Sequence, residues 1–292
     1  MALLAVPNFS EGSETETIEA IVAAFASGGE VLDLHSDAIH NRTVVTLLAD
    51  DPGPALAAGA AACVEWIDVA AQEGAHPRIG ALDVCPVVFA AAEDRERARA
   101  AALEAAGAIA ALGLPVFLYG ELASAPERRE RAFFRRGGPS ELARRLRKGE
   151  LEPDLGPAEA HPSAGATLVT ARAPLAAFNL ILDTAELEIA VAIAAELRES
   201  GGGLPGVRAM AVDLAGRAQV STNVHDPVAV PLAAVIERVR ELAARRGVRP
   251  LEAELVGLVP EAAIAGLPED MPMPGFDPER DVIERRLARP GD

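Results

Sequence analysis

The amino-acid sequence predicts an α+β fold made of two similar halves, each with the element order β-α-β-β-α-β. Two observations lead to this prediction. The chain has 292 residues, of which 50% are hydrophobic, so it can bury a substantial core. Strand-like and helix-like segments also follow one another in the same order twice, separated by residues 150–175, which are rich in proline, glycine and alanine.

In the first half, short apolar runs predict strands, and longer segments with apolar residues at helical spacing predict helices. The predicted strands are residues 2–6, 31–35, 43–49 and 81–90, and the predicted helices are residues 10–27 and 51–72. A further helix over residues 94–113 and a strand over residues 115–119 follow.

The second half repeats the pattern, with a hairpin around Ala215-Gly216 and a helix that ends at three glycines. Its predicted strands are residues 175–183, 207–214, 217–222 and 251–260, and its predicted helices are residues 184–200 and 230–247. The sequence therefore predicts two ferredoxin-like subdomains, residues 1–172 and 173–292. Two such subdomains leave a groove where they join, and grooves between domains are common ligand sites.

Charge and cysteine content exclude several classes of function. The net charge of −17 argues against nucleic acid and against anionic membranes as partners. Cys63 and Cys85 are the only cysteines, which provides neither a disulfide framework nor a four-ligand zinc site. No secretory signal and no apolar run of about 20 residues is visible, so we expect a cytoplasmic protein without a metal.

The segment GAHPRIGALDVCP, residues 74–86, concentrates chemically useful side chains. A residue before proline favours extended geometry, and His76 and Arg78 would then point to the same side. Histidine, with an ordinary pKa of about 6.5, carries protons near neutral pH, and arginine grips a carboxylate at two points. A site for an amino-acid substrate would use both. The alternative is a capping histidine beside a solvated arginine.

Two further polar clusters follow predicted strands. They are Asn8, Ser10 and Glu11 in VPNFSEG, and Asp37, His40, Asn41 and Arg42 in SDAIHNRT. The first cluster suits a helix cap and the second a turn, although loops between strands often carry binding groups.

Two later stretches each have two explanations. GPAEAHPSAG, residues 156–165, would let backbone amides approach a flat ligand closely, or it is a linker. Residues 128–148 carry nine basic side chains in an acidic chain. This stretch would receive a polyanionic tail, or it is a solvated helix whose arginines pair with glutamates.

The segments VPNFSEG, HNRT, HPRIGALDVCP, PVFLYGE, GELEPDLGP, GAT, AFN, QVSTN and LVGLVP, in this order, closely resemble the glutamate formimidoyltransferase (glutamate formiminotransferase) family. The resemblance runs from about residue 5 to residue 260. It implies two α/β subdomains with folate in a groove between them, usually in a homodimer. The implied reaction, a step of histidine degradation, moves a formimino group from N-formimino-L-glutamate to N5 of tetrahydrofolate, the co-substrate, and leaves L-glutamate.

The resemblance also implies site residues. His76 falls on the catalytic histidine of the family, and Arg78, Asp37 and Asn8 are expected to bind the substrate. His35 competes with Asp37 for the family's aspartate before the NRT motif. The folate-binding stretch falls on Gly156, Pro157, Ala158, Glu159, Ala160, His161, Pro162, Ser163, Ala164 and Gly165.

Departures from the animal sequence leave alternatives open. The animal enzyme continues into a cyclodeaminase domain that this sequence lacks, so we expect a separate cyclodeaminase as a partner. The sequence after the CP of residues 85–86 and that between residues 121 and 149 differ from the animal pattern. An N-formylglutamate-dependent formyltransferase, a non-catalytic folate-binding protein and an acidic scaffold protein remain as alternatives.

Overall fold

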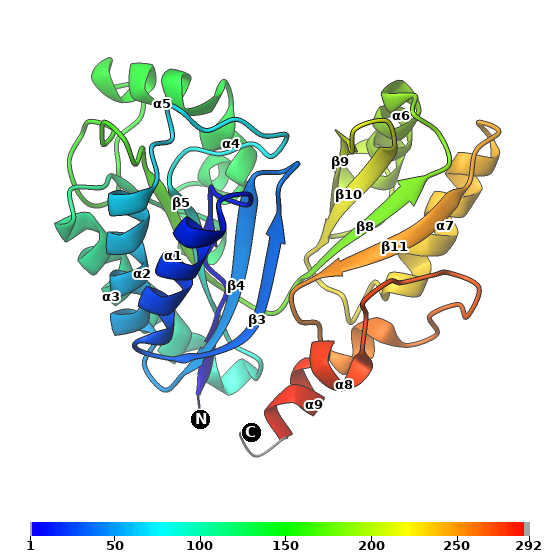
Figure 1. Cartoon of the computed structure of the whole chain (residues 1–292), viewed down its shortest axis with the longest axis horizontal. Coiled ribbons are helices and arrows are strands. Elements are labelled where there is room, and N and C mark those ends of the chain that lie inside the picture. Colours follow the sequence, from blue (N-terminus) through cyan, green and yellow to red (C-terminus); the bar gives the residue numbers. More distant parts are fainter. Residues whose placement is uncertain (1, 289–292) are drawn as a thin grey trace. The chain divides into compact units, whose positions relative to one another are not determined.

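The structure, a computed structural model, describes residues 2–288, which form two compact units that divide between Ala173 and Pro174. Each unit has its own sheet and its own helices (Figure 1). The predicted α+β class, with a βαββαβ order in each half, is confirmed.

The sheet of the first unit contains seven strands in the order β3-β4-β1/β2-β5-β7-β6. The strands are β1 (Leu3–Ala5), β2 (Asn8–Phe9), β3 (Glu30–Asp37), β4 (Arg42–Ala49), β5 (Leu82–Val88), β6 (Val116–Leu118) and β7 (Thr167–Arg172). β1 and β2 both pair with β4 and β5, so they are two pieces of one strand. The strand is interrupted at Pro7, which has no N–H group to donate to the ladder.

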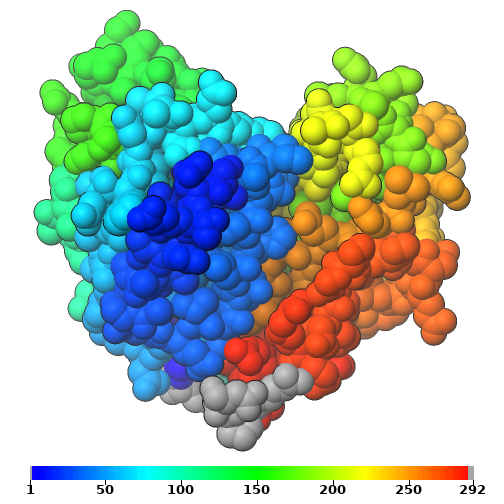
Figure 2. Space-filling model, viewed as in Figure 1, coloured from blue at the N-terminus to red at the C-terminus, as the bar shows by residue number. Residues whose placement is uncertain are grey.

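Helices cover both faces of this sheet. The helices are α1 (Thr15–Ala26), α2 (Gly53–Trp66), α3 (Arg95–Ala111), α4 (Arg131–Arg135) and α5 (Gly138–Arg147). α1, α2 and α3 lie side by side (Figure 1) and bury Phe25, Cys63 and Ile109 against one face. On the other face, Phe134 of α4 and Leu142 of α5 pack over β5, β6 and β7. In the space-filling view of Figure 2, the blue N-terminal elements form much of the visible surface of the first unit.

The second unit has the sheet order β11-β8-β10-β9, with every neighbouring pair antiparallel. Its elements are β8 (Ala176–Leu182), α6 (Leu187–Leu197), β9 (Val207–Asp213), β10 (Ala218–Val224), α7 (Leu232–Ala244), β11 (Pro250–Val256), α8 (Pro278–Asp281) and α9 (Ile283–Ala288). This strand order is the ferredoxin-like arrangement predicted for a split βαβ unit. α6 and α7 bury Ile193 and Ile236 in its core.

Residues 150–175, where the two halves were expected to meet, contain a strand of the first unit. β7 lies inside this stretch and runs parallel to both β5 and β6. Thr167–Ala171 are all buried, as is typical of a parallel strand with both faces covered. The first unit therefore extends the βαββαβ core by two parallel strands, and the predicted folate stretch precedes β7, an internal strand of its sheet.

The basic stretch of residues 128–148 forms α4 and α5, separated by Gly137 at φ 74°, and not one solvated helix. Several of its arginines pair with carboxylates. Arg128 pairs with Asp154 and Arg135 with Asp83 of β5, whereas Arg144 pairs with Glu141 of the same helix and with Glu150.

Cys63 in α2 and Cys85 in β5 are both fully buried in the first unit. Burial raises the pKa of both thiols, that of Cys85 to about 12. None of the helices within residues 2–288 combines the length and apolar character needed to cross a membrane.

Candidate functional site

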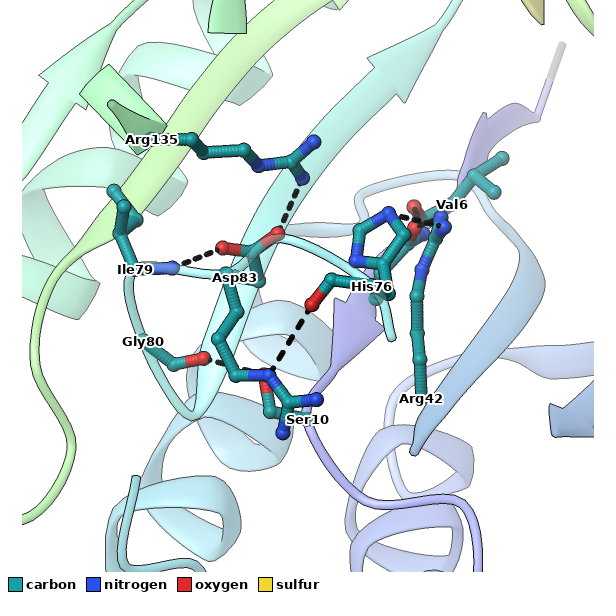
Figure 3. Close-up of polar contacts among 10 residues, drawn as sticks. Val6, Ser10, Arg42, His76, Ile79, Gly80, Asp83 and Arg135 are labelled. Carbon is teal, nitrogen blue, oxygen red and sulfur yellow. Dashed lines mark hydrogen bonds and ion pairs between the residues drawn. The ribbon is translucent and has the colours of Figure 1, made fainter. Parts of the chain in front are cut away.

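The centre of the candidate site is a contact between His76 and Arg42, the first residue of β4. Arg42 Nη1 lies 2.9 Å from His76 Nε2, and its Nη2 donates to Asn8 Oδ1 of β2. Figure 3 shows the guanidinium group of Arg42 pointing at the His76 ring. Asn8 pairs with Val44, so Asn8 and Arg42 lie on the same face of the sheet. The strand register therefore brings the VPNFSEG and NRT segments together beside His76.

His76 is neutral in this environment. Burial lowers its pKa well below the ordinary 6.5, and the positive charges of Arg42, Arg135 and Arg131 lower it further. Arginine has only hydrogen-bond donors, so the neutral ring accepts the Arg42 bond at Nε2 and carries its proton on Nδ1. The lone pair that can take a proton is thus on the side of the ring that faces Arg42.

A carboxylate fixes the loop that carries His76. Asp83 Oδ1 accepts a hydrogen bond from the backbone N–H of Ile79 at 2.7 Å, and Oδ2 forms an ion pair with Arg135 of α4 (Figure 3). Ser10 Oγ donates to the carbonyl of Gly80 at 2.7 Å. The segment after His76 is therefore held by Asp83 of β5 and by Ser10, although residues 75–80 form no regular strand.

Arg78 is only 7% exposed and is engaged with the backbone. Its Nη2 donates to the carbonyl of His40 at 3.2 Å, and its Nε lies 3.5 Å from the carbonyl of His76. Its Nη1 is buried and has no hydrogen-bond partner within residues 2–288. Arg78 thus ties the loop of His76 to that of His40 and keeps one buried donor free.

Asp37 ends β3 and closes the turn to β4 rather than reaching His76. Its Oδ1 accepts from the backbone N–H of His40 at 2.8 Å, and its Oδ2 lies 3.0 Å from His40 Nδ1. Burial opposes ionisation of this carboxyl, but the hydrogen bonds of His40 outweigh burial and lower its pKa to about 2. His35, the alternative to Asp37 for the family's aspartate before the NRT motif, lies two residues earlier on the same strand.

Glu11 has the structural role expected of a cap. Its Oε1 accepts from the backbone N–H groups of Gly12, Ser13 and Glu14 just before α1, and its Oε2 accepts from Gln72 Nε2 at 2.9 Å. Burial opposes its ionisation, yet these bonds together lower its pKa. Glu11 thereby anchors residues 10–14 to the segment that leads to His76.

A pocket of about 700 Å³ lies beside His76 within the first unit. It is bounded by residues 69–78, by the start of α5 and by the predicted folate stretch. Of that stretch, five residues line the pocket: Ala160, His161, Pro162, Ser163 and Gly165. His76, Arg78 and Arg135 line it as well, whereas Asn8 and Asp37 do not. The structure thus brings His76, Arg78 and half of the folate stretch together.

Close backbone contacts fix the folate stretch against the His76 loop. His161 and Gly165 exchange two backbone hydrogen bonds at 2.9 and 3.0 Å, and Ala166 N–H donates to the carbonyl of Ile79 at 3.1 Å. A Cβ atom at Gly80 would lie 1.9 Å from the carbonyl oxygen of Ala166. The glycine is therefore required for the two loops to meet.

Several residues of the site were not predicted to bind or react. They are Arg42, Asp83, Tyr119, Arg131, Arg135 and Arg172, which interact electrostatically with His76 or with one another. Only Asp83 could have been identified from the sequence. It lies in the apolar run LDVCP, and a carboxylate that is buried in such a strand needs a partner. Arg131 and Arg135 belong to the basic stretch noted in the sequence, but nothing in the sequence distinguishes them from their neighbours.

Within the described residues, no group of three or more histidine, cysteine, aspartate and glutamate side chains is arranged to hold a metal ion. The groove expected between the two halves stays a prediction.

Comparison with known proteins identifies relatives for both halves. Residues 2–172 match the N-terminal subdomain of the formiminotransferase domain, and residues 177–267 match the formiminotransferase domain. Glutamate formimidoyltransferase of Streptococcus pyogenes serotype M1 is 38% identical over 290 residues, which cover 97% of both chains. The protein of the same name from Thermoplasma acidophilum is 36% identical over 97% of this chain and 96% of its own. Formimidoyltransferase-cyclodeaminase of Gallus gallus is 38% identical over 89% of this chain, which spans half of that protein.

Proposed function

The chain belongs to the formiminotransferase family, and on this premise we propose that it transfers the formimino group of N-formimino-L-glutamate to N5 of tetrahydrofolate. The products would be 5-formiminotetrahydrofolate and L-glutamate, as in histidine degradation. Two relatives named for this activity match the chain over nearly its full length. The structural observation that carries the proposal is the neutral His76 beside a pocket, whose Nε2 can act as a base once the substrate replaces the hydrogen bond from Arg42.

The reaction needs two proton transfers. N5 of the folate attacks the formimino carbon, and a tetrahedral intermediate forms. The proton of N5 must leave, and a proton must reach the glutamate nitrogen before the bond from that nitrogen to the carbon breaks. One histidine can perform both steps, first as a base and then as an acid. In this mechanism His76 Nε2 takes the proton of N5 and returns it to the departing nitrogen.

Arg42 affects both steps. In the free protein it donates to Nε2, so the attacking substrate must replace this hydrogen bond. Once Nε2 is protonated, the cation of Arg42 destabilises the imidazolium, because two positive charges then face one another. The imidazolium is therefore a strong acid and gives its proton up readily to the leaving nitrogen.

Binding roles follow from the positions of the side chains. The folate is proposed to occupy the pocket lined by Ala160 to Ser163 and Gly165, whose volume of about 700 Å³ suits a ligand of this size. Arg78 is proposed to offer its unpaired Nη1 to a substrate carboxylate. Asn8 and Asp37 are engaged by Arg42 and His40, so they are proposed to position those side chains rather than to touch the substrate.

The cellular setting is proposed from the resemblance. The protein would act as a cytoplasmic homodimer and would pass its product to a separate cyclodeaminase. The name of the Gallus gallus relative joins the two activities in one chain, and the match to it covers 50% of that protein.

The proposal is tested by mixing the purified protein with N-formimino-L-glutamate and tetrahydrofolate and following the absorbance of the folate after conversion to its methenyl form. A parallel reaction uses N-formyl-L-glutamate as the donor. Product from the formimino donor alone is expected. Product from the formyl donor alone would make the protein a formyltransferase, and folate binding without product from either donor would make it a folate-binding protein.

A further inference from the structure

Four arginine side chains of the first unit interact electrostatically with His76, with Tyr119 or with both. They are Arg42, Arg131, Arg135 and Arg172, and Arg131 interacts electrostatically with each of the other three. We call this group the arginine cluster. Its positive charges stand out in a chain whose net charge is −17.

The fold places these arginines on one face of the sheet. Val84 pairs with both Asn8 and Leu168, so Arg42 and Arg172 lie on the same face by the alternation of side chains. They lie towards opposite ends of the strands, since Arg172 pairs with Val88 whereas Arg42 lies beyond the Asn8–Val44 pair, and Arg131 interacts with both. α4 packs on this face through Phe134. Arg131 and Arg135 are four residues apart on α4, which places them on one side of that helix.

The cluster has more positive charge than the carboxylates around it neutralise. Asp83 forms an ion pair with Arg135. Within residues 2–288, Arg131 has neither a hydrogen bond nor an ion pair of its side chain, and Arg172 donates only to the carbonyl of Ala173, at 3.0 Å. Asp83 and the exposed Glu130 both favour the charged form of Arg131, so two carboxylates face the four cations of the cluster. Like charges brought together out of water are costly unless an anion compensates them.

Unpaired buried donors give a second, independent sign of a ligand. The Nε atoms of Arg42 and Arg135 are buried and have no hydrogen-bond partner in the described part of the chain. Buried polar groups normally have partners, and an orphan points to a missing group such as a bound anion. Burial, followed by the charges of Arg135 and Arg131, also lowers the pKa of Arg42 to about 9, which an anion would reverse.

We infer that the arginine cluster binds a dicarboxylate, the glutamate part of the formimino donor, with Arg131 and Arg172 as the residues that grip its carboxylates. The inference rests on the proposed function for the identity of the donor. A guanidinium group binds a carboxylate through two parallel N–H donors, and two guanidinium groups that form no ion pair within residues 2–288 suit two carboxylates. Arg42 and Arg135 then lie at the end of the donor nearest His76.

The position of Arg135 connects this site with the pocket. Arg135 lines the pocket beside the folate stretch and also belongs to the arginine cluster. A donor held by the cluster and a folate held in the pocket would thus lie next to one another beside His76. Such an arrangement lets one histidine exchange protons with both substrates.

The test measures binding of glutarate, a plain five-carbon dicarboxylate, by calorimetry. Arg131→Gln and Arg172→Gln are each expected to weaken glutarate binding roughly tenfold to hundredfold, the loss of a charge-assisted hydrogen bond. Arg172→Lys keeps the positive charge but loses the two parallel N–H donors of the guanidinium group. This variant should therefore retain part of the affinity for glutarate. Arg147→Gln is the matched control, because Arg147 is an exposed arginine of the same basic stretch, and it should bind as the unchanged protein does. Circular dichroism verifies that each variant is folded.

Two results would overturn the inference. One is unchanged glutarate affinity in both folded glutamine variants, and the other is butyrate, a monocarboxylate, binding as tightly as glutarate. In the transfer assay, the variants should raise the KM for N-formimino-L-glutamate by a similar factor while the KM for tetrahydrofolate stays within about twofold. A change in the folate KM alone would assign the cluster to the folate instead. If the unchanged protein binds glutarate but transfers nothing, the proposed function fails and the dicarboxylate site stands.

Discussion

His76 Nε2 lies 2.9 Å from Arg42 Nη1, so the atom expected to act as the base faces a permanent cation. This contact joins residues 34 positions apart in the sequence and determines which nitrogen of the ring carries the proton. It also keeps the ring neutral, since the cation and burial both lower the pKa of His76.

His76→Gln is expected to lower kcat roughly 10²-fold to 10⁴-fold, the usual contribution of a general acid–base group, and to leave folate affinity nearly unchanged. Glutamine can accept the hydrogen bond of Arg42 through its amide oxygen but cannot carry a proton between the substrates. Steady-state kinetics and folate titration measure the two effects. A variant with near-normal turnover would exclude His76 as the proton carrier.

Arg42→Gln should raise the pKa of His76 towards its ordinary value of about 6.5, because the nearest positive charge is removed. Burial and the charges of Arg135 and Arg131 remain in the variant, so the pKa of His76 should rise but stay below its ordinary value. NMR titration of the labelled histidine rings measures this directly. The acid limb of the kcat/KM profile should move to higher pH in parallel.

Arg147→Gln, on the exposed side of α5, serves as the control and should leave the titration of His76 unchanged. If the His76 titration were the same in the Arg42 variant as in the unchanged protein, the electrostatic role of Arg42 would be refuted.

Asp83→Asn should destabilise the first unit by about 3 kcal/mol, because it leaves the buried cation of Arg135 without its partner. Urea unfolding followed by the fluorescence of Trp66, the single tryptophan, reports on this unit. Glu96→Gln removes a solvent-exposed partner of Arg99 and should cost less than about 1 kcal/mol. Equal effects of the two substitutions would show that the Asp83–Arg135 pair does not stabilise the fold.

Gly80→Ala should destabilise the first unit by about 3 kcal/mol, because its Cβ atom would collide with the carbonyl oxygen of Ala166. Gly107→Ala is the matched comparison, since Gly107 lies in α3 with no atom within 4 Å of the added Cβ. That substitution should stabilise the protein by roughly 0.5–1 kcal/mol. Trp66 fluorescence in urea measures both, and a tolerated Gly80→Ala would mean that the two loops need not touch.

Most of the fold was predictable because its elements carry clear local signals. The strand over residues 43–49 and the helix over residues 230–247 correspond to β4 (Arg42–Ala49) and α7 (Leu232–Ala244). β7 was missed because Thr167–Arg172 is short and follows a stretch rich in glycine and proline. Its structure depends on partners on both sides in the sheet, which local sequence does not reveal.

The candidate site was only partly predictable. His76 was identified from the HPR motif, and the pocket contains Arg78 and half of the folate stretch. The partners of His76 come from β4 and α4, and only strand register and helix packing bring them together. Asn8 and Asp37 were expected to bind the substrate, but their side chains engage Arg42 and His40, a relationship that sequence distance conceals.

The two buried thiols allow local opening of the first unit to be detected chemically. Cys63 and Cys85 are the only cysteines of the chain, and both are shielded from reagents in the closed core. Alkylation by iodoacetamide therefore requires that α2 or β5 separate from that core. The rate of labelling then depends on how often this local opening occurs. A substrate that tightens the first unit would slow the labelling, which makes ligand binding visible by mass spectrometry without any catalytic turnover.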